Sequence, residues 1–116
     1  MISRTNRFHG FNSLRSVYRT GKVARGPLFA IKAADNPRRQ SYRLAVVVSR
    51  KVSKSAVARN RIRRRLYETT RSFEPQLSGG PDIVITVFHD TVLEIPQKQL
   101  AGQVKKQLKE LNLLAK

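Results

Sequence analysis

The sequence predicts one α+β domain spanning residues 1–116, a small α/β sandwich in which helices pack on a sheet. The expected order of elements is helix, strand, strand, helix, strand, helix. Two runs, residues 43–48 and 82–88, are rich in β-branched residues and predict strands. Two longer segments, residues 55–73 and 96–111, repeat apolar residues at helical spacing. A chain of 116 residues is long enough for one such domain and too short for two.

The N-terminal segment predicts a basic arm, residues 1–11, followed by a short helix. Asn12 or Ser13 can cap this helix, because their side-chain oxygens accept hydrogen bonds from free backbone N–H groups, and Gly21 suits its end. One face of the helix carries Leu14, Val17 and Tyr18.

Two strands are expected next, joined by a hairpin with a charged tip. Residues 28–31 form the first strand, and the Asp-Asn-Pro sequence at residues 35–37 predicts a turn that Arg38 and Arg39 extend. Residues 43–48 are so continuously apolar that we expect a central strand covered on both faces. One extra short strand is compatible with the same pattern.

A basic helix is expected from Ser53 or Ser55, either of which can cap it, to about Phe73. Its apolar residues fall on one stripe, as in a helix that packs on a sheet. The stripe consists of Ala58, Ile62, Leu66, Thr69 and Phe73. The arginines lie elsewhere, so the helix is apolar on one side and cationic on the other.

A loop, a strand and a final helix complete the chain. Pro75 and the Ser-Gly-Gly-Pro sequence at residues 78–81 predict the loop, and residues 82–88 form the strand. Pro96 suits the first turn of the final helix. That helix has an apolar stripe of Leu100, Val104, Leu108 and Leu111, and a solvated face with Lys98, Lys105, Lys106 and Lys109.

The formal net charge of +17 is far above what solubility needs, and it is unevenly placed. Residues 1–71 carry 19 Lys and Arg against two acids, whereas residues 72–116 carry five lysines against five acids. Such a charge indicates nucleic acid or an anionic membrane surface as partner. No apolar run approaches the roughly 18 residues of a transmembrane helix, and no helix is of the Trp- or Phe-bearing interfacial kind, so we expect no membrane partner.

Residues 59–65, Arg-Asn-Arg-Ile-Arg-Arg-Arg, are the clearest binding signal in the chain. Arginines at helical neighbour spacing repel one another, and few acids lie nearby in sequence to relieve the repulsion. A merely solvated helix face is the alternative, but the run becomes favourable when phosphates face it, because the guanidinium fork matches their oxygens. The expected nucleic-acid contacts are Arg59, Asn60, Arg61, Arg63, Arg64 and Arg65.

Two further groups are candidate contacts. Arg50, Lys51 and Lys54 flank the N-terminus of the basic helix, whose dipole favours a phosphate there. The aromatic rings near the N-terminus either pack internally or stack on the bases of a single strand. These rings belong to Phe8, Phe11 and Tyr18.

No catalytic or metal site can be assembled from this chain alone. The only histidines, His9 and His89, have no acid and nucleophile at a recognisable spacing, and Asp82 is expected to be a turn residue. The pair Gly79-Gly80 lacks the pattern of a phosphate-binding loop, and no ligand cluster suits zinc. Hydrolytic chemistry would therefore belong to a partner. The chain has no cysteine, which is compatible with the cytoplasm, where we expect the protein to act.

The chain resembles the protein subunit of bacterial ribonuclease P. Residues 59–64 resemble that family's RNR motif and follow a Ser-basic-basic-apolar segment, residues 49–52, as in the family. Residues 6–8, 17–18 and 82–85 resemble its N-terminal start, its first-helix aromatic motif and its last strand.

Three features depart from the family pattern. Tyr67 stands where another basic residue is usual, and Leu14 stands where an aromatic residue is frequent. One residue more than usual separates Ser49 from Arg59.

The resemblance implies a left-handed βαβ crossover around the basic helix, as in the second domain of ribosomal protein S5. It also implies a holoenzyme, with one protein per RNA, that removes the 5′ leader of precursor tRNA by metal-dependent phosphodiester hydrolysis. The RNA subunit would be the catalyst and would hold most of the Mg²⁺. The arginine run would contact the RNA subunit, and the sheet face with Leu14, Val17 and Tyr18 would line a cleft for the single-stranded leader.

The competing interpretation is a structural RNA-binding protein such as a small ribosomal protein. Such proteins share the high charge, the Arg-rich helices and the absence of cysteine. The family-like order of segments favours the ribonuclease P interpretation.

Overall fold

The computed structural model describes residues 17–19, 21–35, 41–77 and 80–114, and all structural statements concern these residues. The strands are β1 (Lys22–Arg25), β2 (Phe29–Ala34), β3 (Arg43–Val47) and β4 (Asp82–Val87). The long helices are α2 (Ala56–Arg71) and α3 (Gln97–Glu110), and two 3₁₀ turns, η2 (Glu74–Gln76) and η3 (Asp90–Leu93), flank β4. Residues 17–19 are also helical.

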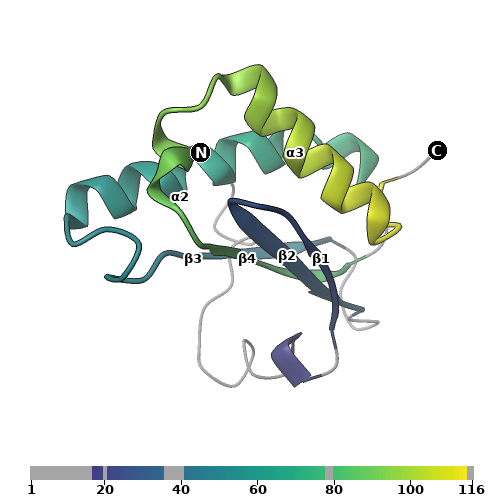
Figure 1. Ribbon diagram of the computed structural model, residues 1–116. Coiled ribbons are helices and arrows are strands. Elements are labelled where there is room, and N and C mark those ends of the chain that lie inside the picture. Colours follow the sequence, from purple (N-terminus) through teal and green to yellow (C-terminus); the bar gives the residue numbers. More distant parts are fainter. Residues whose placement is uncertain (1–16, 20, 36–40, 78–79, 115–116) are drawn as a thin grey trace.

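The strands form one sheet in the order β1-β2-β4-β3. β2 pairs antiparallel with β1 and β4, whereas β3 pairs parallel with β4, and the chain crosses between these two through α2. Figure 1 shows α2 and α3 on one face of the sheet and the helical residues 17–19 on the other. The α+β sandwich expected from the sequence is therefore confirmed, including the βαβ crossover around the basic helix.

The extra short strand that the sequence allowed is present as β1, and two other details of the sheet differ from the sequence-based expectation. β1 lies at the edge of the sheet and buries only Ala24, which leaves little periodicity to detect. The predicted hairpin between the strands before and after residues 35–37 is wrong, because β4 lies between β2 and β3. β3 is an edge strand rather than the central one. Its apolar run reflects cover on both faces and not a central place in the sheet.

The main core lies between the sheet and the two long helices. Alternate strand residues such as Ile31, Leu44 and Ile85 are fully buried against it. From α2 it takes Ile62 and Leu66, and from α3 it takes Leu100, Val104 and Leu108. A smaller cluster on the opposite face joins Val17 to Ala45 and Val84.

Local signals fix the ends of α2. Of the two expected caps, Ser55 is the N-cap, and its Oγ accepts a hydrogen bond from the Ala58 N–H at 3.1 Å. The Ser53 hydroxyl instead accepts from the Ser55 N–H at 3.3 Å. The helix ends at Arg71, two residues before the expected Phe73, which is half-buried against the core.

Two polar pairs hold the start of β3, one to β4 and the other to η2. Arg43 and Asp82 face each other at the start of β3 and β4, and two hydrogen bonds of 2.8 and 2.9 Å join their side chains. Asp82 is thus an ion-pair residue rather than the expected turn residue. The buried Tyr42 hydroxyl donates to Glu74 Oε1 at 2.5 Å, and burial with this hydrogen bond raises the Tyr42 pKa far above its usual value.

The glycine expected to end the first helix lies at a close approach of two backbone segments. The Gly21 N–H donates to the Val17 carbonyl at 2.8 Å. A Cβ at position 21 would lie 2.5 Å from that carbonyl oxygen and 2.9 Å from the Ala33 oxygen. Any larger residue would therefore push the helical residues 17–19 away from β2.

Leu66→Ala should destabilise the protein by about 2–5 kcal/mol, because it removes a fully buried side chain between α2 and the sheet. Val57→Ala is the matched control on the same helix. Its side chain is 63% exposed, so the change should stay within about 0.5 kcal/mol. Denaturant unfolding measures both free energies. Equal effects of the two substitutions would contradict the packing of α2 on the sheet.

Candidate nucleic-acid interface

The outer side of α2 is a cationic surface with no acidic residue in its first turn. Arg61 and Arg64 are exposed, as is Asn60, and Arg63 is half-buried. The Asn60 carboxamide oxygen accepts a hydrogen bond from the Arg63 guanidinium, which holds Arg63 along the helix surface. We define this surface, residues 60, 61, 63 and 64, as the arginine ridge.

A shallow pocket at the N-terminus of α2 gathers four cations. It is lined by Arg50, Lys51, Lys54 and Arg59. The sequence pattern groups the first three, whereas it predicts Arg59 only on the helix face. Arg59 turns back toward the pocket because its Nη1 donates to the Ser53 carbonyl at 2.9 Å. Four cations beside a helix N-terminus suit a phosphate group.

Arg65 differs from its neighbours in the arginine run. Its guanidinium is half-buried and donates to the carbonyl groups of Val92 and Ile95 in the segment that leads into α3. Its Nε also lies 3.4 Å from Gln97 Oε1. Three nitrogens of Arg65 are thus engaged within the protein. The sequence pattern predicts Arg65 to be one of the nucleic-acid contacts and gives no sign of these internal hydrogen bonds.

The face of the sheet opposite α2 and α3 carries the residues expected to meet a single strand. Val17 is only 1% exposed and packs on Ala45 and Val84, so it anchors the helical segment and offers no surface to a ligand. Tyr18 is 43% exposed. Lys32 Nζ lies 5.4 Å from the centre of the Tyr18 ring and donates to the Tyr18 carbonyl at 2.9 Å. Leu14 and the arm 1–11 lie outside the described residues.

A second aromatic–cation pair stands on this face, which we call the open face. Arg25 lies 5.7 Å from the centre of the Phe88 ring, and Phe88 is 44% exposed. The sequence pattern predicts Phe88 only as a strand residue. Because Val87 points into the core, alternation directs the next side chain to the other face, and this signal could have identified Phe88.

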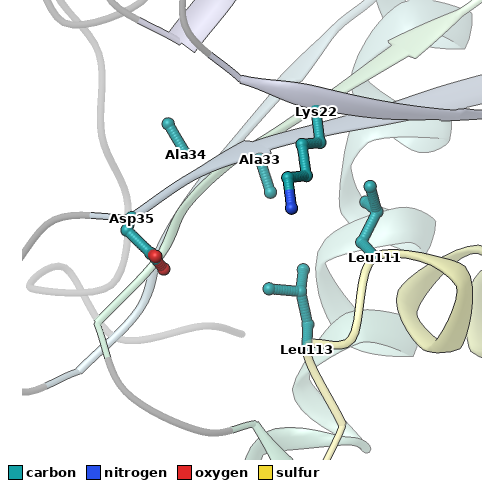
Figure 2. A pocket seen from close by; sticks show the side chains of 6 residues that line it. All are labelled: Lys22, Ala33, Ala34, Asp35, Leu111 and Leu113. Carbon is teal, nitrogen blue, oxygen red and sulfur yellow. The ribbon is translucent and has the colours of Figure 1, made fainter.

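A separate hollow of about 340 Å³ lies between the sheet and the end of α3. It is lined by Lys22, Ala33, Ala34, Asp35, Leu111 and Leu113. Figure 2 shows the Lys22 ammonium pointing into it, with Leu111 on one side, Asp35 on the other and Leu113 below. One lysine and one aspartate give no excess charge, so this hollow is a poorer phosphate site than the pocket at the start of α2.

The described residues contain no group of three or more His, Cys, Asp or Glu side chains that could hold a metal ion. His89 Nδ1 accepts from the Thr91 N–H at 3.1 Å and caps η3. His9 lies outside the described residues. No helix in the described part of the chain is long and apolar enough to span a bilayer.

Comparison with known sequences identifies one family. A family model described as Ribonuclease P matches residues 2–112. The ribonuclease P protein component of a Pseudanabaena species is 36% identical over 116 residues, which cover 100% of this chain and 94% of the relative. That of Chloroflexus aurantiacus is 34% identical over 113 residues, covering 97% and 82%.

Solved structures share the fold. A mutant of the Staphylococcus aureus RNase P protein superposes with a TM-score of 0.84 at 20% identity, covering 96% of this chain and 92% of that one. The RNase P protein from Thermotoga maritima gives a TM-score of 0.71 at 22% identity, covering 84% and 87%. These structural similarities support the α+β arrangement, whereas family membership is shown by the family model and the sequence relatives.

Removal of two arginines from the arginine ridge, by Arg63→Ala with Arg64→Ala, should weaken RNA binding and flatten its salt dependence. Each phosphate that the variant no longer neutralises lowers the slope of log affinity against log salt by roughly 0.9 on a duplex or 0.7 on a single strand. Both residues lie off the buried stripe, so the melting temperature should not change. Lys105→Ala with Lys106→Ala, on the exposed side of α3, removes the same charge as a control. An equal decrease of slope in the two double variants would mean that net charge, and not the arginine ridge, determines binding.

Proposed function

The chain belongs to the ribonuclease P protein component family, and from this premise we propose how it binds its two RNA partners. As a member of that family it partners with the ribonuclease P RNA in the holoenzyme that processes the 5′ ends of tRNA. We propose that the arginine ridge and the pocket at the start of α2 bind the RNA subunit. The open face then binds the single-stranded 5′ leader of precursor tRNA.

The observation that carries this proposal is the separation of cations from apolar residues on α2. The helix buries Ile62 and Leu66 on the sheet and turns the arginine ridge outward. A polyanion along the ridge would relieve the repulsion among these arginines. The neighbouring pocket adds four cations at a helix N-terminus, where backbone N–H groups favour phosphate.

The leader is assigned to the open face because that face combines exposed rings with cations. Tyr18 lies beside Lys32, and Phe88 lies beside Arg25. Single-stranded nucleic acid binds by stacking its bases on rings while cations neutralise its backbone. Two such pairs on one face would hold an extended strand at two points.

Catalysis is assigned to the RNA subunit, which would hold the Mg²⁺ that hydrolysis needs. The protein would contribute binding and positioning, with one protein per RNA. Because the substrate would be precursor tRNA, we expect the complex to act in the cytoplasm.

Reconstitution tests the proposed function. The protein is mixed with a bacterial ribonuclease P RNA and precursor tRNA at low magnesium, and leader removal is followed on a gel. The complete mixture should cleave much faster than RNA alone, and protein freed of RNA by nuclease treatment should not cleave. No stimulation of the RNA would reject the proposal. Cleavage that follows the nuclease-treated protein through successive columns would place catalysis on this chain.

Tyr18→Ala should lower affinity for precursor tRNA about five- to a hundredfold, because one stacked base is worth about 1–3 kcal/mol. Affinity for mature tRNA should not change, since mature tRNA has no leader. The matched control is Val17→Ala, which removes a buried neighbour and should lower the melting temperature. Both affinities and the melting temperature are measured for each variant. The stacking role would be excluded if a well-folded Tyr18→Ala protein discriminated between precursor and mature tRNA as well as the wild-type protein does.

A further inference from the structure

Arg65 connects α2 to the segment that precedes α3. Its Nη1 donates to the Val92 carbonyl at 2.7 Å and its Nη2 donates to the Ile95 carbonyl. These two acceptors lie in η3 and just after it. A planar guanidinium can reach two such carbonyl oxygens at once, which an ammonium cannot do with the same fixed geometry.

A second link runs beside the first. Gln97, the first residue of α3, donates from Nε2 to Thr69 Oγ1 at 2.9 Å, and that hydroxyl donates to the Arg65 carbonyl at 2.8 Å. Thr69 is 2% exposed, so this part of the network is shielded from water. Arg65 and Thr69, one turn apart on α2, therefore clamp the start of α3. We call this network, Arg65, Thr69 and Gln97, the α2–α3 clamp.

The α2–α3 clamp adds to the core packing because it resists rotation of α2 about its own axis. The buried residues of α2 are Ile62, Leu66, Thr69 and Thr70, which form one stripe along the helix. Packing along this stripe fixes the height of the helix above the sheet, and contacts on the flanks of the helix resist rotation about its own axis. Hydrogen bonds on one flank of the helix oppose that rotation.

We propose that Arg65 is a positioning residue, which sets the rotation of α2 and thereby aims the arginine ridge, and that it makes no phosphate contact of its own. This inference rests on the proposed function, since the ridge is the surface that would meet the RNA subunit. The direction of the ridge depends on rotation because Arg61 and Arg64 lie on the same helix as the clamp. A small rotation displaces several guanidinium groups together.

The salt dependence of the RNA affinity distinguishes a positioning residue from a residue that contacts phosphate. A residue that binds a phosphate contributes roughly 0.9 to the slope of log affinity against log salt on a duplex, or 0.7 on a single strand. A residue that only aims the ridge changes affinity and leaves the number of released counterions the same. Arg64→Ala provides the matched contact variant, because Arg64 is an exposed neighbour on the same helix.

The experiment measures affinity for ribonuclease P RNA at four salt concentrations, at a temperature at which circular dichroism shows every variant to be folded. Arg65→Ala should lower affinity several-fold with an unchanged slope, and its melting temperature should fall. Arg65→Lys keeps the charge and removes the fork, so it should behave like Arg65→Ala. Gln97→Ala, which changes no charge and lies on another helix, should also lower affinity at constant slope. Arg64→Ala should instead lower both affinity and slope with an unchanged melting temperature.

Three results would overturn the proposal. If Arg65→Ala reduces the slope as Arg64→Ala does, or Arg65→Lys restores full affinity, then Arg65 contacts phosphate directly. If the folded Arg65→Ala and Gln97→Ala proteins bind RNA like wild type, the α2–α3 clamp serves stability only. Failure of the proposed function looks different, because the wild-type protein itself would then show no salt-dependent affinity for this RNA.

Discussion

Parallel pairing of β3 with β4 is the constraint on which the rest of the structure depends. Parallel neighbours cannot be joined by a tight turn, so the chain between Val47 and Asp82 crosses one face of the sheet as α2. The Arg43–Asp82 ion pair joins the first residues of the two strands and supports their register. Once Ile62 and Leu66 are buried on the sheet, helical periodicity directs the arginine ridge outward.

The same crossing leaves two surfaces that lie on different sides of the sheet. α2 and α3 cover one face (Figure 1). The open face carries Tyr18 with Lys32 and Phe88 with Arg25. Because β3 and β4 are parallel neighbours, their C-terminal ends lie at the same end of the sheet. Phe88 follows β4 at that end, and the segment with Arg50 and Lys51 follows β3 there. In the proposed function, a strand on the open face would thus pass close to the pocket at the start of α2.

The sequence predicted those parts of the fold that depend on local patterns. The Ser55 cap, the buried Ile62–Leu66 stripe and the burial of Leu100, Val104 and Leu108 follow from helical periodicity and are confirmed. The place of β3 at the edge does not follow from local pattern, because strand order is set by long-range pairing. For the same reason the sequence could group Arg50, Lys51 and Lys54 but could not foresee that Arg59 joins them, or that Val92 and Ile95 supply acceptors to Arg65.

Arginine content therefore overstates the number of arginines free to bind phosphate. Arg43 is paired with Asp82, Arg59 uses one nitrogen on the Ser53 carbonyl, and Arg65 uses three nitrogens within the protein. A guanidinium has five N–H donors, so Arg59 retains donors for the pocket that it lines, whereas Arg65 has few left. The charge of Arg65 still adds to the field that attracts RNA, but salt screens that field over about 10 Å at 0.1 M. Composition thus sets long-range attraction, and hydrogen bonding within the fold decides which arginines can contact the RNA.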